Sequence, residues 1–310
     1  MSAGLLLCLV LLATLGLFSV LLSAVVAVVW HTGLSRKLVS SADMLTLRLL
    51  PFSGALLLVF AVVLPAFMAY EPAGEREATG PILLTLAALA CTMLGHGIWR
   101  AWRASVAARE LLDQWRSDGH SALDHAPHVE VLDVTEPIVA VVGGWRPRII
   151  AGRSVVAACS EEEFTQVIAH EAAHIRSHDN FKLLLLTASP DPLAWIPLGA
   201  TLVERWRAAA EREADEHATG ADPRRRVALA SALIKVARLG VDTGGCPALS
   251  MRVGADDVET RVRRLLEAPQ TSPAAMASRV VLCALLIPFL GAPLYEMVHE
   301  LVEALVRLGA

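Results

Sequence analysis

The sequence lacks the features that mark several common classes of protein. Of its five cysteines, Cys8, Cys91 and Cys283 lie inside apolar runs, and no pair shows the spacing of metal ligands. This pattern argues against a disulfide framework and suits a reducing compartment for the soluble part. Acidic and basic residues nearly balance, the formal net charge is −4, and no domain stands out as basic. Direct binding to nucleic acid is therefore not expected.

The chain is instead marked by long apolar runs, and hydrophobic residues make up 55% of its sequence. A helix needs roughly 20 predominantly apolar residues to cross a bilayer. The first run lacks the basic start of a cleaved signal peptide and is long for one, so a persistent transmembrane helix is favoured over that alternative. The sequence therefore predicts a mainly α membrane protein with about four transmembrane helices, within residues 3–30, 44–70, 81–99 and 274–295.

The charged loops indicate how these helices cross the bilayer. Two basic residues follow the first run, the loop near residues 71–80 is acidic, and four arginines follow the third run. Basic residues mark the cytoplasmic side of a membrane. We therefore expect the N-terminus outside the cell, a three-helix transmembrane region over residues 1–100 and a cytoplasmic domain over residues 101–273. A last crossing and a short extracellular tail are expected within residues 274–310.

Residues 183–203 are apolar enough to enter a membrane, but three prolines and Asp191 interrupt them. A straight crossing would also place His170 and Glu211, which belong to the candidate site below, on opposite sides of the bilayer. The expected form is a helical hairpin that dips into the membrane or lies against it. A hairpin in a soluble core is the alternative.

The cytoplasmic domain is predicted to be α+β, with a small antiparallel sheet. Residues 128–142 hold an alternating stretch and a β-branched run, and residues 147–156 have a similar composition. Gly143 and Gly144 between them indicate a turn.

Helices are expected on the C-terminal side of this sheet. Ser160 followed by Glu163 fits a capping box, and apolar residues then recur at helical spacing over residues 164–178. Further helices are expected at residues 204–219, 224–239 and 256–266.

The helix over residues 164–178 carries His170-Glu171-Ala172-Ala173-His174. Histidines four residues apart on a helix point the same way, so His170 and His174 can bind one tetrahedral zinc ion. Glu171 beside them can accept the proton of a water on the metal. The motif predicts one zinc ion per chain.

A third ligand cannot come from the same helix. His178 shares the face, but it lies about 12 Å from His170 along the helix axis, which is too far for a shared ion. It fits better as a polar residue at the helix end. Asn180 stands where the metzincin pattern would require a further histidine, so that pattern fails.

An acidic residue of the helix at 204–219 can complete the set. Glu211 and Asp215 are four residues apart and share a face, whereas Glu213 points elsewhere. We expect Glu211 to bind the ion and Asp215 to accept a hydrogen bond from a ligating imidazole. A merely solvated charged helix over residues 204–217 is the alternative.

Several short motifs resemble those of the membrane zinc peptidases of the BlaR/MecR antirepressor type. They come in the family's order, and the resemblance spans most of residues 80–270. Glu211-x-x-x-Asp215 also resembles the motif of the wider gluzincin group, which includes HtpX-type and CAAX-prenyl proteases. The matching segments are Pro147-Arg148-Ile149-Ile150, residues 161–175, Asp179-Asn180 and Glu211–Asp215.

The resemblance implies a zincin-like (gluzincin) fold, with His170, His174 and Glu211 as zinc ligands and Glu171 as catalytic base. It also implies a role in signal transduction through cleavage of a cytoplasmic protein, often a transcriptional repressor. A small winged-helix repressor is one candidate substrate. The β-lactam receptors of this type continue into a large extracellular sensor domain, whereas this sequence ends at Ala310, so β-lactam sensing is not expected.

The combined patterns predict an integral-membrane zinc endopeptidase of the cell membrane. Zinc would polarise the scissile carbonyl and acidify its bound water, while Glu171 moves the proton to the leaving amine. Arg212 and His217 are weak candidates for the oxyanion, and a strand at residues 137–142 could pair with the substrate backbone. Two alternatives stay open: an HtpX-like quality-control protease, and a membrane receptor or scaffold with a structural zinc. The patterns identify neither the substrate nor the oligomeric state.

Overall fold

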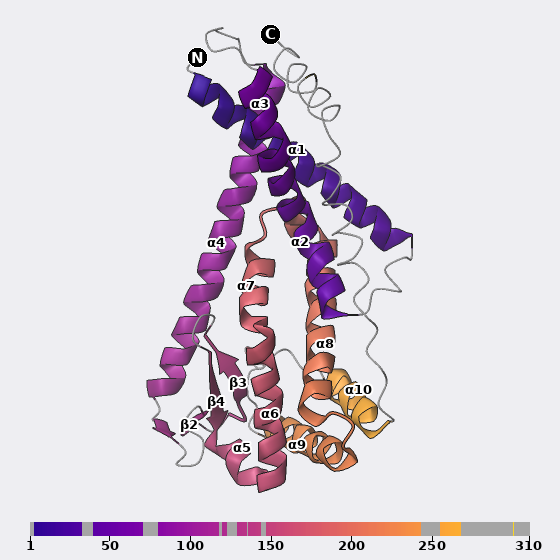
Figure 1. Ribbon diagram of the computed structural model, residues 1–310. Coiled ribbons are helices and arrows are strands. Elements are labelled where there is room, and N and C mark those ends of the chain that lie inside the picture. The colour runs from indigo at the N-terminus through magenta and orange to yellow at the C-terminus, as the bar shows by residue number, and fades with distance from the viewer. Residues whose placement is uncertain are drawn as a thin grey trace. The chain divides into compact units, whose positions relative to one another are not determined.

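The described part of the chain folds into helices and one small sheet (Figure 1). The chain divides into two compact units. The first unit comprises residues 1–102, 185–206 and 273–310, and the second comprises residues 103–184 and 207–272. The predicted fourth crossing, at residues 274–295, lies outside the described residues. The computed structural model describes residues 3–32, 40–70, 80–117, 120–122, 129–134, 136–143, 147–242, 255–267 and 300.

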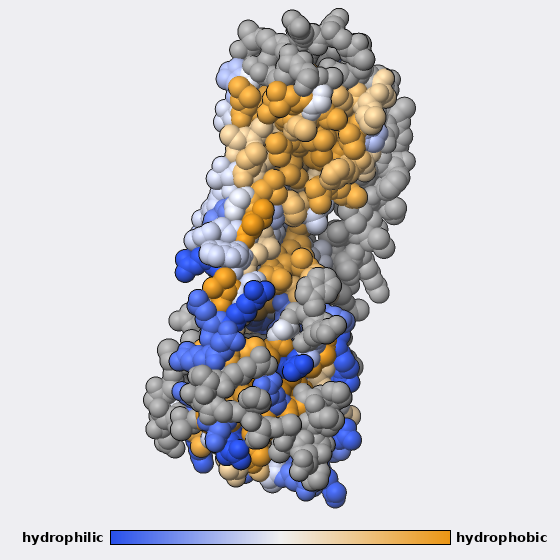
Figure 2. Space-filling model, turned by 90° about the vertical axis from the view of Figure 1, so that its left-hand side faces the viewer, coloured by the Kyte–Doolittle hydropathy of each residue, from blue (hydrophilic) through white to orange (hydrophobic). Residues whose placement is uncertain are grey.

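Within the described residues, three helical segments are long and apolar enough to cross a membrane. Two of them lie in the first unit, and the third begins there and continues into the second. Figure 2 shows hydrophobic residues covering much of the surface over these helices. A helix can face lipid because its backbone groups are bonded within it and the side chains on its outside are apolar. This finding agrees with the first three predicted crossings. The segments are Gly4–His31 of α1 (Ala3–His31), Ser41–Ala69 across α2 (Ser41–Leu58), a π-helical turn (Val59–Val63) and α3 (Leu64–Tyr70), and Pro81–Trp115 of α4 (Pro81–Ser117).

Small residues let these helices approach closely. A Cβ atom on Gly16 of α1 would lie 2.8 Å from the carbonyl oxygen of Leu86 in α4, and one on Gly54 of α2 would lie 2.9 Å from a methyl group of Leu22. Glycine at such positions permits the van der Waals packing that holds membrane helices together. The main cluster of this unit includes Val10, Val63 and other buried aliphatic residues of α1, the π-helical turn and α4.

Residues 185–206 of the first unit are joined to α2 by a buried ion pair. They include the end of α7 (Asp179–Ala188), a 3₁₀ turn (Pro192–Trp195) and the start of α8 (Pro197–Thr219). Asp191 lies 2.5 Å from Nη1 of Arg48 in α2, and both side chains are almost fully buried. Asp191 also accepts hydrogen bonds from Ser189 Oγ at 2.5 Å and from the Leu193 amide at 3.0 Å. These contacts fix the turn against α2.

The sheet of the second unit has four strands in the order β1 (His120–Ala122), β2 (Val129–Leu132), β4 (Arg148–Gly152), β3 (Val139–Val142). The β3–β4 pair is antiparallel, as predicted. β1, where no strand was predicted, pairs antiparallel with β2, but β2 and β4 are parallel. The prediction of an all-antiparallel sheet was therefore wrong. Alternating apolar residues show that a segment has two faces, but they do not show which strand becomes its neighbour.

The segment after β4 also differs from the prediction. Strand pairing ends at Gly152, and Arg153–Ala158 form a short helix, α5, where β structure was expected up to residue 156. Val155 is fully buried on this helix and Val156 packs near the sheet. Valine favours strands only where a pleated surface receives it, and here the helix buries it instead.

Helix α6 (Glu161–Ser177) begins with the predicted capping box. Ser160 Oγ accepts a hydrogen bond from the Glu163 amide at 3.3 Å, and Glu163 Oε2 accepts one from the Ser160 amide at 2.7 Å. Glu163 also receives Lys235 Nζ and Ser231 Oγ of α9 (Pro223–Asp242), each at 2.6 Å. The helix ends at His178, whose φ of 56° lies in the left-handed region. The contacts of Glu163 thus fix the first turn of α6 to α9.

Two apolar clusters hold α6 in place within the second unit. Phe164, Ile168 and Ile175 pack on the buried residues of β2 and β4. Ala169, on another face of α6, packs with α8, α9 and α10 (Ala255–Leu266). The helix that carries the histidines therefore lies between the sheet and three other helices.

Candidate metal centre

His170 and His174 of α6 lie one helical turn apart and direct their Nε2 atoms at one another. The two nitrogens are 3.1 Å apart, and the residues are only 6% and 5% exposed. Two neutral imidazoles at this separation bring their lone pairs to a common point. The spacing of four residues on α6 produces this arrangement directly.

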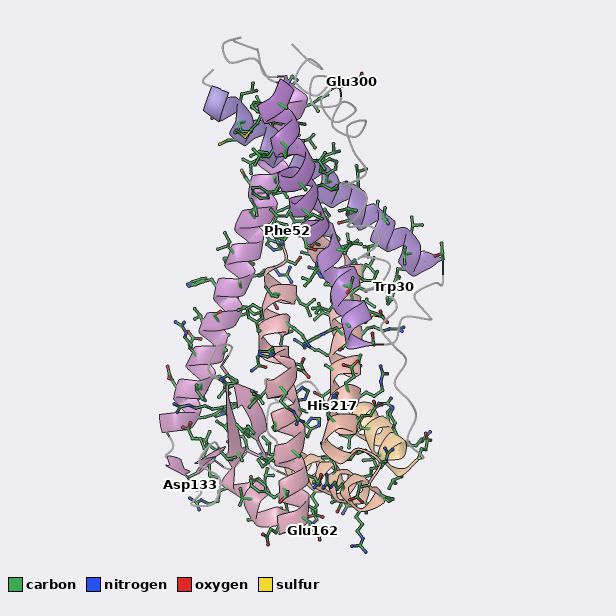
Figure 3. The ribbon with its side chains drawn as sticks, in the orientation of Figure 1. Trp30, Phe52, Asp133, Glu162, His217 and Glu300 are labelled. Atoms are coloured by element: carbon green, nitrogen blue, oxygen red, sulfur yellow. The ribbon has the colours of Figure 1, made fainter. Side chains whose placement is uncertain are left out.

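Glu211 of α8 completes a close group of three possible ligands. Its Oε2 lies 3.4 Å from His170 Nε2, and its Oε1 lies 3.4 Å from His174 Nε2. A tetrahedral zinc ion with ligand distances of about 2.0–2.1 Å would separate its ligand atoms by about 3.4 Å. The three residues therefore fit such an ion. Figure 3 shows the two helices, with Glu162 at the start of α6 and His217 near the end of α8.

The outer nitrogens of both histidines face carboxylates. Asp215 Oδ1 lies 3.0 Å from His170 Nδ1, and Asp179 Oδ2 lies 2.8 Å from His174 Nδ1. A carboxylate hydrogen-bonded to Nδ1 holds the proton there and leaves Nε2 free for a metal, as Asp179 does for His174. Asp215 lies within reach of His170 Nδ1, but its geometry does not complete a hydrogen bond. Sequence reasoning placed Asp215 in this role but gave none to Asp179. The available signal was its position directly after the helix that carries His174.

An arginine of α10 binds two of the acidic residues of α8, Glu211 and Asp215. Arg261 Nε and Nη2 lie 3.0 and 2.6 Å from the two oxygens of Asp215, and Nη1 lies 2.8 Å from Glu211 Oε2. Arg261 is 4% exposed. Sequence reasoning missed it, because residues 256–266 were interpreted only as a charged helix. The available signal was its position four residues before the apolar Leu265, on the same helix face.

The charges of this group are strongly coupled. Burial lowers the pKa of His170, but Asp215 and Glu211 outweigh it and raise that pKa to about 9. Burial has the same effect on His174, where Asp179 and Glu211 raise the pKa to about 10. Burial raises the pKa of Glu211, yet contacts with both histidines and Arg261 bring it well below its usual value. The lowered pKa favours the ionised form of Glu211, and the raised pKa values favour protonated histidines, so protons compete with a metal for these nitrogens.

Glu171 lies beside the ligand group without belonging to it. Its side chain is half-buried on α6, and burial raises the pKa of its carboxyl group. A carboxylate with a raised pKa accepts a proton more readily than one in water. Its position and its basicity suit proton transfer next to the metal.

Three other polar residues that the sequence singled out make contacts outside the ligand group. His178 is the C-cap of α6, and its amide donates to the carbonyl groups of the preceding turn. Asn180 donates from Nδ2 to the carbonyl oxygens of Val141 at 2.9 Å and Gly143 at 3.2 Å, which attaches α7 to β3. His217 is exposed, and its Nδ1 lies 2.6 Å from a backbone carbonyl of its own helix. None of the three belongs to the close ligand group found in the described part of the chain.

One comparison with known proteins gave a match. A family model described as BlaR1 peptidase M56 matches residues 18–265, which include the metal centre and most of the three candidate spans. The comparisons with curated proteins and with solved structures gave no match. The similarity of the chain to known proteins therefore rests on the family model.

Proposed function

Because the chain belongs to the BlaR1 peptidase M56 family, we propose that it is an integral-membrane zinc endopeptidase. The family match makes it a peptidase of the membrane, in agreement with the resemblance noted from its motifs. The observation that carries the zinc assignment is the buried group of His170, His174 and Glu211. The two Nε2 atoms lie 3.1 Å apart, and each lies 3.4 Å from one of the two carboxylate oxygens of Glu211. Imidazole nitrogen and carboxylate oxygen are ligands that catalytic zinc commonly takes.

The proposed reaction is hydrolysis of a peptide bond. When bound, the zinc ion would supply Lewis-acid polarisation of the scissile carbonyl and of the attacking water. Glu171 takes a proton from that water as its oxygen bonds to the carbonyl carbon. The same proton passes to the leaving nitrogen as the carbon–nitrogen bond breaks. Asp179 keeps His174 in the tautomer that binds metal, and Asp215 lies within reach of His170 Nδ1.

The edge of the sheet supports an extended mode of substrate binding. β3 is the last strand of the described sheet, and Asn180 binds the carbonyl groups of Val141 and Gly143 at its end. An edge strand can accept a peptide as a further strand, with main-chain hydrogen bonds giving affinity. The substrate backbone would then extend along β3.

The proposed substrate is a cytoplasmic protein, with a winged-helix transcriptional repressor as the first candidate. This proposal follows from the family and from the basic residues that flank the second unit, which favour a cytoplasmic location. An HtpX-like quality-control protease would use the same site chemistry on misfolded membrane proteins. The two proposals differ in how many substrates accumulate when the enzyme is inactive.

Substitution of Glu171 tests the reaction. Glu171→Gln should retain zinc but reduce peptide cleavage by the detergent-purified protein at least ~100-fold, because proton transfer is lost. The matched change Glu162→Gln, at an exposed position of the same helix, should leave the zinc content and the rate of peptide cleavage unchanged. Cleavage at the wild-type rate by Glu171→Gln would contradict the proposal. In cells, accumulation of one regulator would support the signalling role, and accumulation of many membrane proteins the quality-control role.

A further inference from the structure

The side chain of Arg261 contacts two residues of the candidate metal centre from a helix that no motif includes. We propose that Arg261 is a positioning residue, which fixes Glu211 and, through Asp215, His170 in the geometry that binds the ion. The inference rests on the proposed zinc site and assigns it a further component. α10 then becomes part of the metal centre.

The contacts of Arg261 join it to two of the three ligands. Its guanidinium is bidentate on Asp215, at 2.6 and 3.0 Å, and Nη1 lies 2.8 Å from Glu211 Oε2. Asp215 in turn faces Nδ1 of His170 at 3.0 Å. A displacement of Arg261 would therefore release one ligand directly and loosen the support of a second.

Charge explains why an arginine is suited to this place. Glu211 and Asp215 are 6% and 4% exposed and lie one turn apart on α8, so their negative charges repel each other with little screening by water. A planar guanidinium can bind one carboxylate with two nitrogens and a second with the third. A lysine ammonium is a point charge and does not reproduce this planar geometry.

The direction of the guanidinium indicates a supporting role. All three of its nitrogens face the carboxylates of Glu211 and Asp215, and its closest approach to a ligating imidazole is 3.5 Å, from Nη2 to His170 Nε2. Arg261 thus acts through the ligands. Its loss should change how tightly the metal is held and how fast bound substrate reacts more than how tightly substrate binds.

A second arginine keeps α10 in the position from which Arg261 reaches the site. Arg226 of α9 donates to the carbonyl oxygens of Arg264, Leu265 and Glu267 at 2.7–2.9 Å. Leu265 also packs in the cluster that includes Leu229 of α9. The end of α10 is therefore anchored independently of the metal centre.

Metal affinity of the purified full-length protein tests the inference. Zinc affinity is measured by competition with a chromophoric chelator, and the visible spectrum of the cobalt(II) form reports ligand geometry. Arg261→Gln should weaken zinc binding at least tenfold, alter the cobalt spectrum and lower kcat with little change in KM. The zinc affinity and the kcat of Arg261→Lys should lie between those of Arg261→Gln and the wild type. Arg263→Gln, an exposed position on the same helix, is the matched control and should leave all three unchanged.

The outcomes separate this inference from the proposed function. Wild-type zinc affinity and an unaltered cobalt spectrum in Arg261→Gln would overturn the inference while leaving the zinc site standing. If Arg261→Gln does not fold, the test uses Arg261→Lys instead. Wild-type zinc affinity in Arg261→Lys, together with the full helix content of the wild type, would overturn the inference. Failure of the wild type to bind zinc would overturn the proposed function and this inference together.

Discussion

At the scale of single residues, protons and metal compete for the same nitrogens. Carboxylates around the site raise the pKa of His170 to about 9 and that of His174 to about 10, despite the opposing effect of burial. Zinc binds only neutral imidazole. Near neutral pH, metal binding must therefore release protons from the site.

This competition predicts a steep pH dependence of zinc affinity. The raised pKa values of the two histidines favour their protonated forms in the neutral range, so affinity should rise by about one order of magnitude per pH unit for each proton that the metal displaces, from about pH 6. It should level off above about pH 10. Chelator competition at stepped pH, corrected for the titration of the chelator, measures the slope. Constant affinity between pH 6 and 8 would contradict the prediction.

Glu163 gives a second prediction, for stability. Burial raises its pKa, but hydrogen bonds from Lys235, Ser231 and the Ser160 amide outweigh burial and lower the pKa to about 2. A lowered pKa stabilises the fold above the unfolded value of about 4.3, and this contribution is lost as pH falls towards 2. Glu163→Gln should therefore lower the free energy of unfolding by about 1–3 kcal/mol at pH 7.

Thermal unfolding followed by circular dichroism checks the Glu163 prediction. The difference between Glu163→Gln and the wild type should shrink as pH falls from about 5 to 3, because the Glu163 carboxylate takes up a proton there in the unfolded chain while it stays ionised in the folded protein. Glu162→Gln, exposed in the same helical turn, should differ little from the wild type at any pH. A difference at Glu163 that does not depend on pH would contradict the assigned cause.

At the scale of elements, the turn between α7 and α8 exposes apolar side chains next to a candidate membrane span. Trp195 and Ile196 are 46% and 44% exposed, and Trp195 Nε1 donates to His96 of α4 at 3.1 Å. Ile98 and Trp99, which follow His96 on α4, are 70% and 48% exposed. Tryptophan is enriched where membrane meets water. We expect this turn to contact lipid, as the hairpin prediction for residues 183–203 requires.

A nitroxide label tests the position of this turn. Attached at Ile196→Cys in a background without the natural cysteines, in lipid nanodiscs, it should be more accessible to oxygen than to a nickel chelate. The same label at Val227→Cys, a comparably exposed apolar position on α9, should show the opposite preference. Equal preferences at the two positions would contradict lipid contact and favour the soluble hairpin.

Sequence patterns anticipated elements whose cause is local and missed those whose cause is distant. The capping box and the pair His170 and His174 depend on spacing within one helix, so the residues specify them directly. The parallel pairing of β2 with β4 depends on how the chain crosses between strands. Arg261 reaches the site from a helix 50 residues beyond Glu211, and no local pattern records such a contact.

At the scale of the whole molecule, two units of different character share one chain. The first contains two of the candidate membrane spans and the start of the third, and the second contains the sheet and the metal centre. Run length and apolar composition were enough to predict the spans, because the thickness of a bilayer sets the length of the helix. The cytoplasmic location of the second unit and the crossing at residues 274–295 stay predictions.

The central claim is that His170, His174 and Glu211 bind one zinc ion, and the zinc content of the purified protein tests it most directly. Elemental analysis after exhaustive dialysis should find about one zinc per chain in the wild type and in Glu213→Ala, which changes an acidic residue of α8 outside the ligand group. Glu211→Ala should hold almost none. A wild type without zinc, or full zinc content in Glu211→Ala, would contradict the account.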